Sequence, residues 1–179
     1  MTHAADVLLM AVVLPLTIAA GLTDWFCHRR SWIESTSGLK ENLFHWALLA
    51  IMGVALAAVA LLEITAGVLL LVLACWLAHE ALTYVELRYT LPLRSVRALE
   101  QMVHSFMELL PLVLLGVLAV AHWDQVAGLF GAGTADFGFR PKAQPWPHAY
   151  LAAAFTAALV CNILPMAEET LRCIRRTPF

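Results

Sequence analysis

The clearest pattern along the chain is a series of long apolar runs separated by short polar segments. Five windows are apolar enough, and at about 20 residues long enough, to cross a hydrocarbon core about 30 Å thick as helices. They cover approximately residues 5–25, 43–63, 66–87, 103–122 and 148–168. The runs lack the alternation of apolar and polar residues that marks the strands of a membrane barrel. We therefore expect an all-α integral membrane bundle of about five transmembrane helices, forming a single domain over residues 1–179.

Several local features refine this bundle. Pro15, Pro111 and Pro165 lie inside the first, fourth and fifth windows, where membrane helices tolerate proline as a kink. The first apolar run has no Lys or Arg before it and continues into polar sequence, so we interpret it as a retained helix rather than a cleaved signal peptide. The turn at 62–65 predicts a tight hairpin, and the Gly- and Pro-rich segment 123–147 predicts an external loop.

Composition supports the membrane assignment. Hydrophobic residues make up 61% of the chain and charged residues only 13%, whereas soluble domains average about 25% charged residues. The net charge of -2 provides no basic field for nucleic acid, which we exclude as a partner. The lipid bilayer is the expected environment, and a multi-pass protein of the cell membrane, specifically a bacterial inner membrane, is the expected location.

The basic residues predict the orientation. The segments after the first, third and fifth windows contain nine of the Lys and Arg residues, namely Arg29, Arg30, Lys40, Arg88, Arg94, Arg97, Arg172, Arg175 and Arg176. The other side of the bundle has only Arg140 and Lys142. Because cytoplasmic loops are enriched in basic residues, we expect the N-terminus outside and the C-terminus in the cytoplasm.

Carboxylates and histidines recur in pairs near the expected cytoplasmic ends of the windows. Three pairs have the same spacing of four residues: Asp24 with His28, Glu41 with His45, and His104 with Glu108. In a helix this spacing places both side chains on one face, one turn apart, so that both can approach the same cation. Ionisable groups inside a membrane helix are costly, and they tend to face inward and to be functional.

The third window adds further ligands of the same kind. His79 and Glu86 are seven residues apart and share a helix face, and Glu80 follows His79 directly. Glu34 is either a bridging ligand on an extension of the first helix or a solvated partner of Arg30. The complete set of candidate metal ligands is Asp24, His28, Glu34, Glu41, His45, His79, Glu80, Glu86, His104 and Glu108.

This ligand set predicts two or more metal ions. Imidazole and carboxylate without thiolate suit iron, with manganese or zinc as alternatives. There are more ligands than one tetrahedral zinc ion could use, so carboxylate bridges between ions are the economical interpretation. Some acids then orient the imidazoles instead of binding metal.

The arrangement resembles a known class at the level of ligand chemistry. Carboxylate and His ligands projecting from four helices are similar to those of the di-iron carboxylate proteins, and a cluster at the cytoplasmic edge resembles the membrane hydroxylases and desaturases. The spacing departs from both, because Glu41-x-x-x-His45 replaces Glu-x-x-His and the chain has no HxxxH or HxxHH box. The resemblance covers residues 24–108 and implies O₂ activation by a reduced two-metal centre.

The implied function is oxidation of a lipid-like or other membrane-dissolved substrate, with a separate electron donor. Arg29, Arg88 and Arg94 are candidates to bind a substrate headgroup, with an alternative role in setting orientation. The segment 88–101 predicts a turn at Pro92 and a short interfacial helix at a substrate entrance. The alternatives are a divalent-ion transporter or sensor, a metal-dependent lipid or phosphoester hydrolase, and a bis-histidine haem protein. The sequence leaves homo-oligomer formation open.

Overall fold

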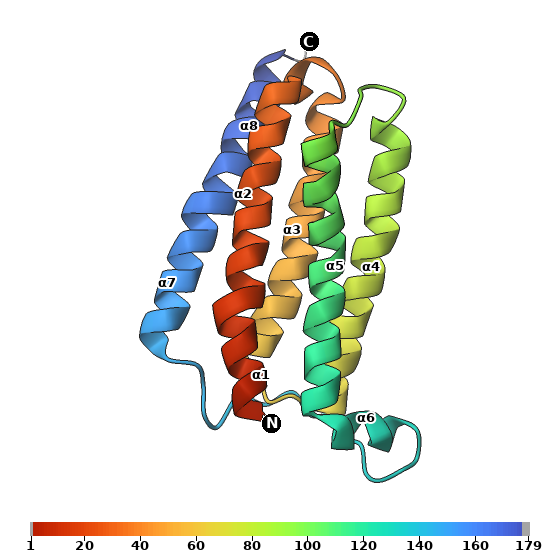
Figure 1. Ribbon diagram of the computed structural model, residues 1–179, viewed down its shortest axis with the longest axis vertical. Helices are drawn as coiled ribbons and strands as arrows, with labels where there is room; N and C mark the ends of the chain where they lie inside the picture. Colours follow the sequence, from red (N-terminus) through yellow and green to blue (C-terminus); the bar gives the residue numbers. More distant parts are fainter. Residues whose placement is uncertain (1, 177–179) are drawn as a thin grey trace.

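The computed structural model describes residues 2–176 and consists of helices (Figure 1). The elements in chain order are α1 (Thr2–Leu8), the π-helical turn η1 (Leu9–Val13), α2 (Leu14–Ser31), the 3-10 turn η2 (Ile33–Ser35), α3 (Gly38–Leu61), α4 (Ala66–Thr90), α5 (Ala98–Ala121), α6 (Trp123–Leu129), α7 (His148–Ala158), the π-helical turn η3 (Leu159–Ile163) and α8 (Leu164–Arg176). The described residues form no strand beyond an isolated bridge between Leu62 and Pro141. The all-α prediction is confirmed.

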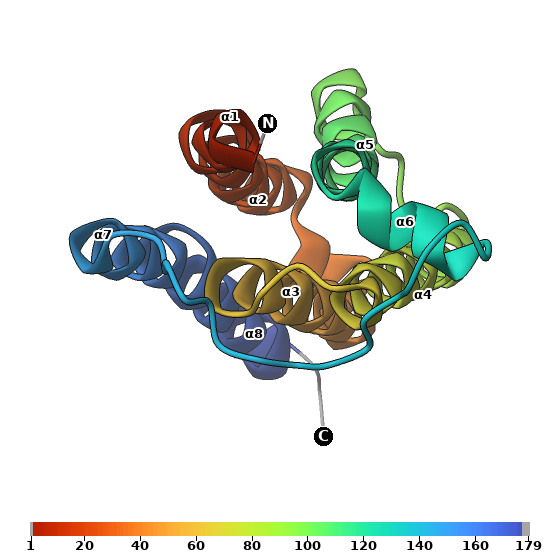
Figure 2. The ribbon, with the colours of Figure 1, turned by 90° about the horizontal axis from the view of Figure 1, so that it is seen from below.

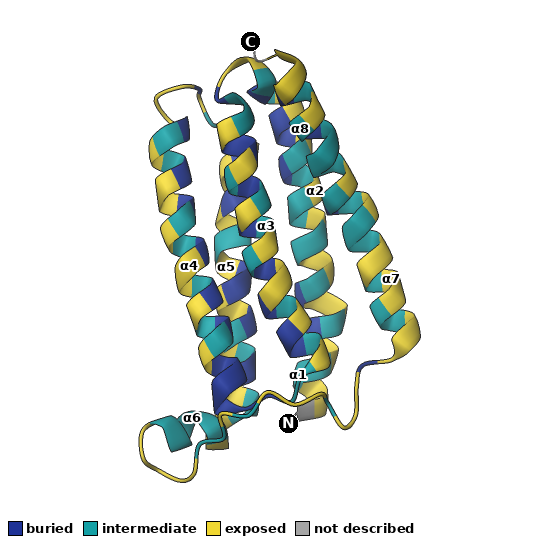
Figure 3. Cartoon of the chain, turned by 180° about the vertical axis from the view of Figure 1, so that it is seen from behind, coloured by how far each residue is buried: buried dark blue, intermediate teal, exposed yellow. Residues whose placement is uncertain are grey.

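Five helical segments are long and apolar enough to cross a membrane. They are His3–Ser31, Gly38–Leu61, Ala66–Thr90, Ala98–Ala121 and His148–Arg176. Large apolar side chains such as Leu77, Val120 and Phe155 are exposed on the helices, whose exposed residues are drawn in yellow in Figure 3. A surface of this kind is unfavourable in water and suits contact with lipid tails. The predicted bundle of five membrane-spanning helices is therefore confirmed.

The spans surround a common interior. Seen along the bundle, α3 lies between α7 and α4, and α2 and α5 lie across from this row (Figure 2). Helix α3 packs on α4, α2 packs on α5, and α8 contacts both α2 and α3. The chain begins at one end of the bundle and α8 finishes at the other (Figure 1). Which end faces the cytoplasm stays a prediction from the basic residues.

Helices α3, α4 and α5 extend beyond their apolar windows. Helix α3 begins at Gly38, α4 continues to Thr90, and α5 begins at Ala98. A hydropathy window ends where polar residues begin, whereas the backbone hydrogen bonds of a helix continue through such residues. The predicted turn at Pro92 is confirmed, and the short helix predicted before the fourth window is not a separate element, because residues 98–101 are the first turn of α5. The segment 123–147, predicted to be an external loop, contains the short helix α6.

Two π-helical turns accommodate prolines in the first and last spans. Pro15 and Pro165 each follow a widened turn, in which Leu14 N–H bonds to the Leu9 carbonyl and Leu164 N–H to the Leu159 carbonyl. Proline lacks an N–H and its ring collides with the carbonyl four residues earlier, so a wider turn relieves the conflict. The kinks expected at these prolines therefore take the form of π turns.

The interior divides into two halves along the bundle. The half nearest α6 has an apolar core that includes Val13, Val59, Val68, Leu114 and Leu118. The buried carboxylates and histidines lie instead on α2, α3, α4, α5 and α8, toward the end at which α8 finishes. The fold thus places one apolar and one ionisable interior in the same bundle.

The segment after α6 is fixed against the start of α4. Gly67 N–H donates to the Asp136 carbonyl over 3.1 Å, and Thr65 Oγ1 donates to the Gly138 carbonyl over 2.9 Å. A Cβ atom on Gly67 would lie 2.7 Å from the Phe137 carbonyl oxygen, which is too close for an unstrained contact. Gly67 therefore allows backbone to approach backbone at this point.

Substitution Gly67→Ala should lower the melting temperature of the detergent-purified protein. Overpacking against backbone costs about 1 to 3 kcal/mol, more than the roughly 1 kcal/mol that alanine adds in helix propensity. Gly116→Ala is the matched control, because a Cβ atom there meets nothing within 4 Å. A Gly67→Ala protein that melts at or above the wild-type temperature would contradict this account of the close approach.

Candidate metal centre

All five membrane spans contribute to one buried cluster of carboxylates and histidines. Its members are buried, and they are Asp24 and His28 from α2, Glu41 and His45 from α3, His79 and Glu86 from α4, Glu100 and His104 from α5, and Glu169 from α8. On α2, α3 and α5 the two residues are four positions apart, and on α4 they are seven apart, so each pair occupies one helix face. The amphipathic ends of the helices thus converge on one polar interior.

His28 lies at the middle of this cluster. Its Nδ1 atom is 3.2 Å from Glu169 Oε2, and a carboxylate there can only accept, so Nδ1 carries the proton. The Nε2 atom faces three carboxylates. It lies 3.5 Å from Asp24 Oδ1, 3.5 Å from Glu100 Oε1 and 3.9 Å from Glu41 Oε1. Buried Nε2 has no hydrogen-bond partner among the described residues.

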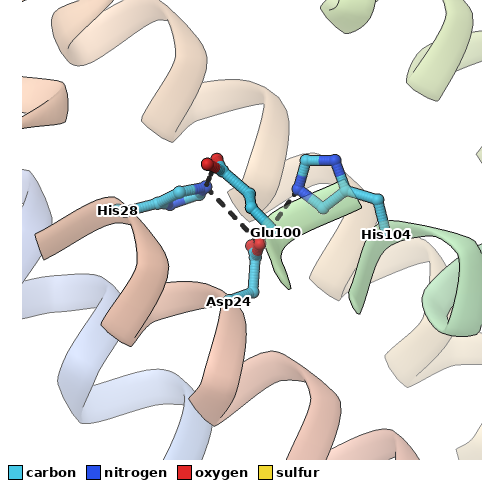
Figure 4. Close-up of side chains that lie close together, drawn as sticks. All are labelled: Asp24, His28, Glu100 and His104. Atoms are coloured by element: carbon cyan, nitrogen blue, oxygen red, sulfur yellow. Dashed lines mark hydrogen bonds and ion pairs between the residues drawn. The ribbon is translucent and has the colours of Figure 1, made fainter. Parts of the chain in front are cut away.

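Two groups of side chains have the spacing to hold a metal ion. The first is Asp24, His28, Glu100 and His104, and the second is His28, Glu41 and His45. Within each group, one ligand atom from every residue lies within 4.8 Å of the others. Figure 4 shows the first group, with Asp24 between His28 and His104 and Glu100 reaching toward His28.

The histidines of the cluster make close contacts with one another and with the carboxylates. The rings of His28 and His45 stack with their centroids 4.5 Å apart. His104 Nε2 lies 2.9 Å from Asp24 Oδ1, and His45 Nε2 lies 3.9 Å from Glu86 Oε1. The buried His45 Nδ1 and Glu100 Oε2 atoms lack hydrogen-bond partners among the described residues. Several buried polar atoms of the cluster are therefore open to a ligand.

Arg94 supplies the cationic partner of the cluster. Its guanidinium donates to Glu41 through Nε over 3.2 Å and through Nη2 over 2.5 Å, and Nη2 also lies 2.5 Å from Glu100 Oε1. Burial alone would lower the pKa of Arg94, but the hydrogen bonds that the guanidinium donates to these carboxylates outweigh burial and raise the pKa above its ordinary value. The loop between α4 and α5 is thus attached directly to the candidate ligands.

The charges within the described part of the bundle do not balance. Five carboxylates are buried, those of Asp24, Glu41, Glu86, Glu100 and Glu169, whereas Arg94 is the one buried guanidinium. Arg172 approaches Glu169 from the margin at 3.8 Å and is partly exposed. With neutral imidazoles, the interior has a clear excess of negative charge. The excess indicates either bound cations or several protonated groups.

The structure brings together most of the predicted ligands. Members of the cluster are Asp24, His28, Glu41, His45, His79, Glu86 and His104, and His79 also lines a small cavity together with Glu108. Glu80 and Glu108 are only partly buried at the margin, and Glu80 lies 3.8 Å from His79 Nδ1. These two acids are adjacent to the candidate metal positions but belong to neither ligand group.

Glu34 lies outside both ligand groups. Its carboxylate accepts a hydrogen bond from Arg172, so the predicted pairing with Arg30 is wrong. Glu34 follows α2 in the separate turn η2, and α2 does not extend far enough to carry it toward the centre. The prediction of Glu34 as a bridging ligand therefore does not fit its position.

The three arginines predicted to bind a substrate headgroup have different positions. Arg29 is exposed and donates to Glu168 Oε1 over 2.7 Å, and Arg88 is exposed beside Tyr84. Arg94 is only 8% exposed and is bound by two carboxylates. Its position corrects the headgroup interpretation, because a guanidinium in this arrangement is not accessible to a headgroup.

Neither Glu100 nor Glu169 is among the ligands predicted from the sequence. Glu100 is the residue four positions before His104, the spacing already noted in two other pairs. It lay outside the apolar window that began at residue 103. Comparison with known protein families, curated proteins and solved structures found no match for this chain. The assignment of the cluster therefore depends on its geometry.

Substitution Arg94→Gln should destabilise the protein strongly. Removing one partner of a buried ion pair costs about 3 to 5 kcal/mol, because the remaining charges stay buried and unpaired. The expected result is a clear fall in melting temperature in detergent. Arg88→Gln is the control, since Arg88 is exposed. Equal melting temperatures for the two variants would show that Arg94 does not neutralise Glu41 and Glu100.

Proposed function

We propose that this protein is a membrane metalloenzyme whose buried centre holds two or more divalent metal ions, most economically iron, and uses O₂ to oxidise a membrane-dissolved substrate. The environment of His28 Nε2 carries the proposal. Three carboxylate oxygens lie 3.5 to 3.9 Å from this nitrogen, farther than the 2.7 to 3.2 Å typical of a hydrogen bond. A proton on Nε2 would form only weak hydrogen bonds to these oxygens. A metal ion with bonds of about 2.0 to 2.2 Å to nitrogen and oxygen fits among them.

The contact between Glu169 and His28 supports the same conclusion. A histidine that binds metal usually donates its other ring N–H to a carboxylate, which fixes the tautomer and the orientation of the ring. Glu169 occupies this position at Nδ1, and Asn42 Nδ2 in turn donates to Glu169 Oε1 over 2.9 Å. The supporting contacts extend to a second layer, as they do around protein metal sites.

The charge balance supports more than one ion. Two divalent cations would offset the excess of buried carboxylates over Arg94 if the imidazoles are neutral. His28 belongs to both candidate groups, so neighbouring ions would share its immediate surroundings. Carboxylates able to bridge two ions, such as Glu41 and Glu100, lie 3.9 and 3.5 Å from its Nε2 atom.

Oxidation is the chemistry that best suits this ligand set and its location. Imidazole and carboxylate ligands favour iron or manganese, and the centre lies among helices that expose apolar surface to lipid. Hydroxylation of a C–H bond would consume O₂, two electrons and two protons, and would release the alcohol and water. The electrons would come from a separate donor. We expect the enzyme to reside in the cell membrane, with the bacterial inner membrane as the proposed location.

The alternative functions have less support. A transporter for divalent ions needs polar groups that continue through the membrane. Here the half of the bundle nearest α6 is filled by an apolar core. A metal-dependent hydrolase would use the same ligands with metal-activated water, and it differs from an oxidase in needing neither O₂ nor a reductant.

Elemental analysis after anaerobic purification without chelators tests the proposal directly. We expect iron at one or more ions per chain, and O₂ consumption when a reductant is added. Zinc alone, with no dependence on O₂, would overturn the oxidase assignment. Metal below stoichiometric amounts after loading with iron, manganese and zinc would overturn the metal centre itself.

Substitution Glu169→Gln should lower metal affinity by about 10- to 100-fold, because His28 loses the carboxylate that fixes its tautomer. The measurement is competition for iron or manganese with a chelator of known affinity. Glu168→Gln is the matched control, since Glu168 precedes Glu169 on α8 but bonds outward to Arg29 and Trp25. Similar affinities for both variants would exclude Glu169 as a residue that positions a metal ligand.

A further inference from the structure

A small cavity opens from the cluster toward the apolar interior. Its volume is about 80 Å³, and its walls include Asp24, His28, His45 and His79 on one side. Apolar side chains, among them Met107, Leu110 and Pro111, line much of the rest. The face of the centre that is open to a substrate is therefore directed into the bundle, away from the loop that carries Arg94.

A larger groove lies between α2, α3 and α7. It has a volume of about 620 Å³, within the roughly 300 to 1,000 Å³ range of ligand sites. No charged residue lines it, and its polar side chains are those of Thr17 and Asn162 and the two tryptophans Trp46 and Trp146. Figure 1 shows α7 diverging from its neighbours toward the N-terminal end, while α8 stays close to α2.

The groove adjoins the inner cavity. Four residues line both spaces: Thr17, Leu49, Met52 and Asn162. Asn162 lies in the π turn η3 and is held there because its Nδ2 atom donates to the Ile18 carbonyl over 3.0 Å. A groove on the side of the bundle thus lies next to the cavity at the candidate metal centre, with these four side chains at the boundary.

The far end of the groove has an interfacial character. Trp146 Nε1 donates to Asp6 Oδ1 over 2.8 Å, and the Lys142 ammonium lies 4.9 Å from the Trp146 ring centroid. Amphipathic side chains of this kind are typical of the headgroup level of a bilayer. From Leu61 at this end to Leu49 at the junction, α3 rises about 18 Å.

From these features we infer that the groove admits one hydrocarbon tail of a bilayer lipid, which enters sideways between α3 and α7 and brings its apolar end to the His/carboxylate centre. The lack of charged groups excludes a headgroup from the groove, and the interfacial residues near Trp146 give the headgroup a place at the opposite end. This inference rests on the proposed function and assigns its substrate class: the carbon to be oxidised belongs to an apolar chain end.

Gly53 offers a direct way to obstruct the groove. It lines the groove on α3, and a Cβ atom there meets nothing within 4 Å, so a larger side chain can occupy the open space without displacing protein atoms. Gly116 on α5 has the same open surroundings and lines none of the cavities described above. Gly53→Leu and Gly116→Leu are therefore a matched pair of variants.

The experiment uses nanodiscs of phosphatidylcholine in which one acyl chain carries a diazirine at its terminal carbon. Illumination followed by peptide mass spectrometry should show insertion at Leu48 and Met52, which are buried from surrounding lipid. We expect Gly53→Leu to reduce this labelling several-fold and Gly116→Leu to leave it unchanged. A phosphatidylcholine with the diazirine in its headgroup should not label these residues.

The outcomes separate this inference from the proposed function. Equal labelling in the two leucine variants, no labelling of Leu48 and Met52, or labelling by the headgroup probe would each overturn the tail-binding groove. Metal content is measured on the same samples. A protein that binds iron but shows no groove labelling keeps the metal centre and loses the lipid tail, whereas labelling without metal supports the groove and overturns the enzyme.

Discussion

The described interior buries five carboxylates but only one arginine, and this imbalance of charge is the constraint on which the structure depends. Each ionised group inside a membrane helix costs about 2.5 to 3.5 kcal/mol on insertion scales, so an unbalanced cluster is expensive. The protein reduces this cost in two visible ways. Arg94 reaches in from the loop between α4 and α5 to bind Glu41 and Glu100, and Glu169 is satisfied by His28 and Asn42. The remaining negative charge is what gives bound cations a stabilising role.

The same constraint accounts for the division of the bundle into two halves. Apolar side chains fill the half nearest α6, so that the buried carboxylates and histidines of all five spans meet near the other end. Such an arrangement suits a reaction centre that limits access of water. It is poorly suited to moving an ion across the membrane, because the core described for the half nearest α6 is apolar.

The sequence was sufficient to predict the fold and the kind of site. Apolar runs predict the spans, and carboxylate–imidazole pairs at helical spacing predict which faces turn inward. It could not decide between Glu100 and Glu108, which lie four residues before and four residues after His104. Burial decides this, since Glu100 is 1% exposed beneath Arg94 while Glu108 remains partly exposed. The contacts of Arg94 and Glu34 depend on how the helices are rotated about their axes and connected to one another. A hydropathy pattern does not contain that information.

The fifth span links the two parts of the proposed site. Its second half places Glu169 against His28 Nδ1, and its first half, α7, forms one wall of the groove. A residue added in a π turn rotates the following helix by about 100° relative to an uninterrupted α-helix. The turn η3 therefore allows α7 and α8 to present different faces of one continuous span to the interior, with Asn162 at the point where the groove meets the inner cavity. The proposed support of a metal ligand and the proposed admission of a lipid tail thus depend on the same local departure from α-helical geometry.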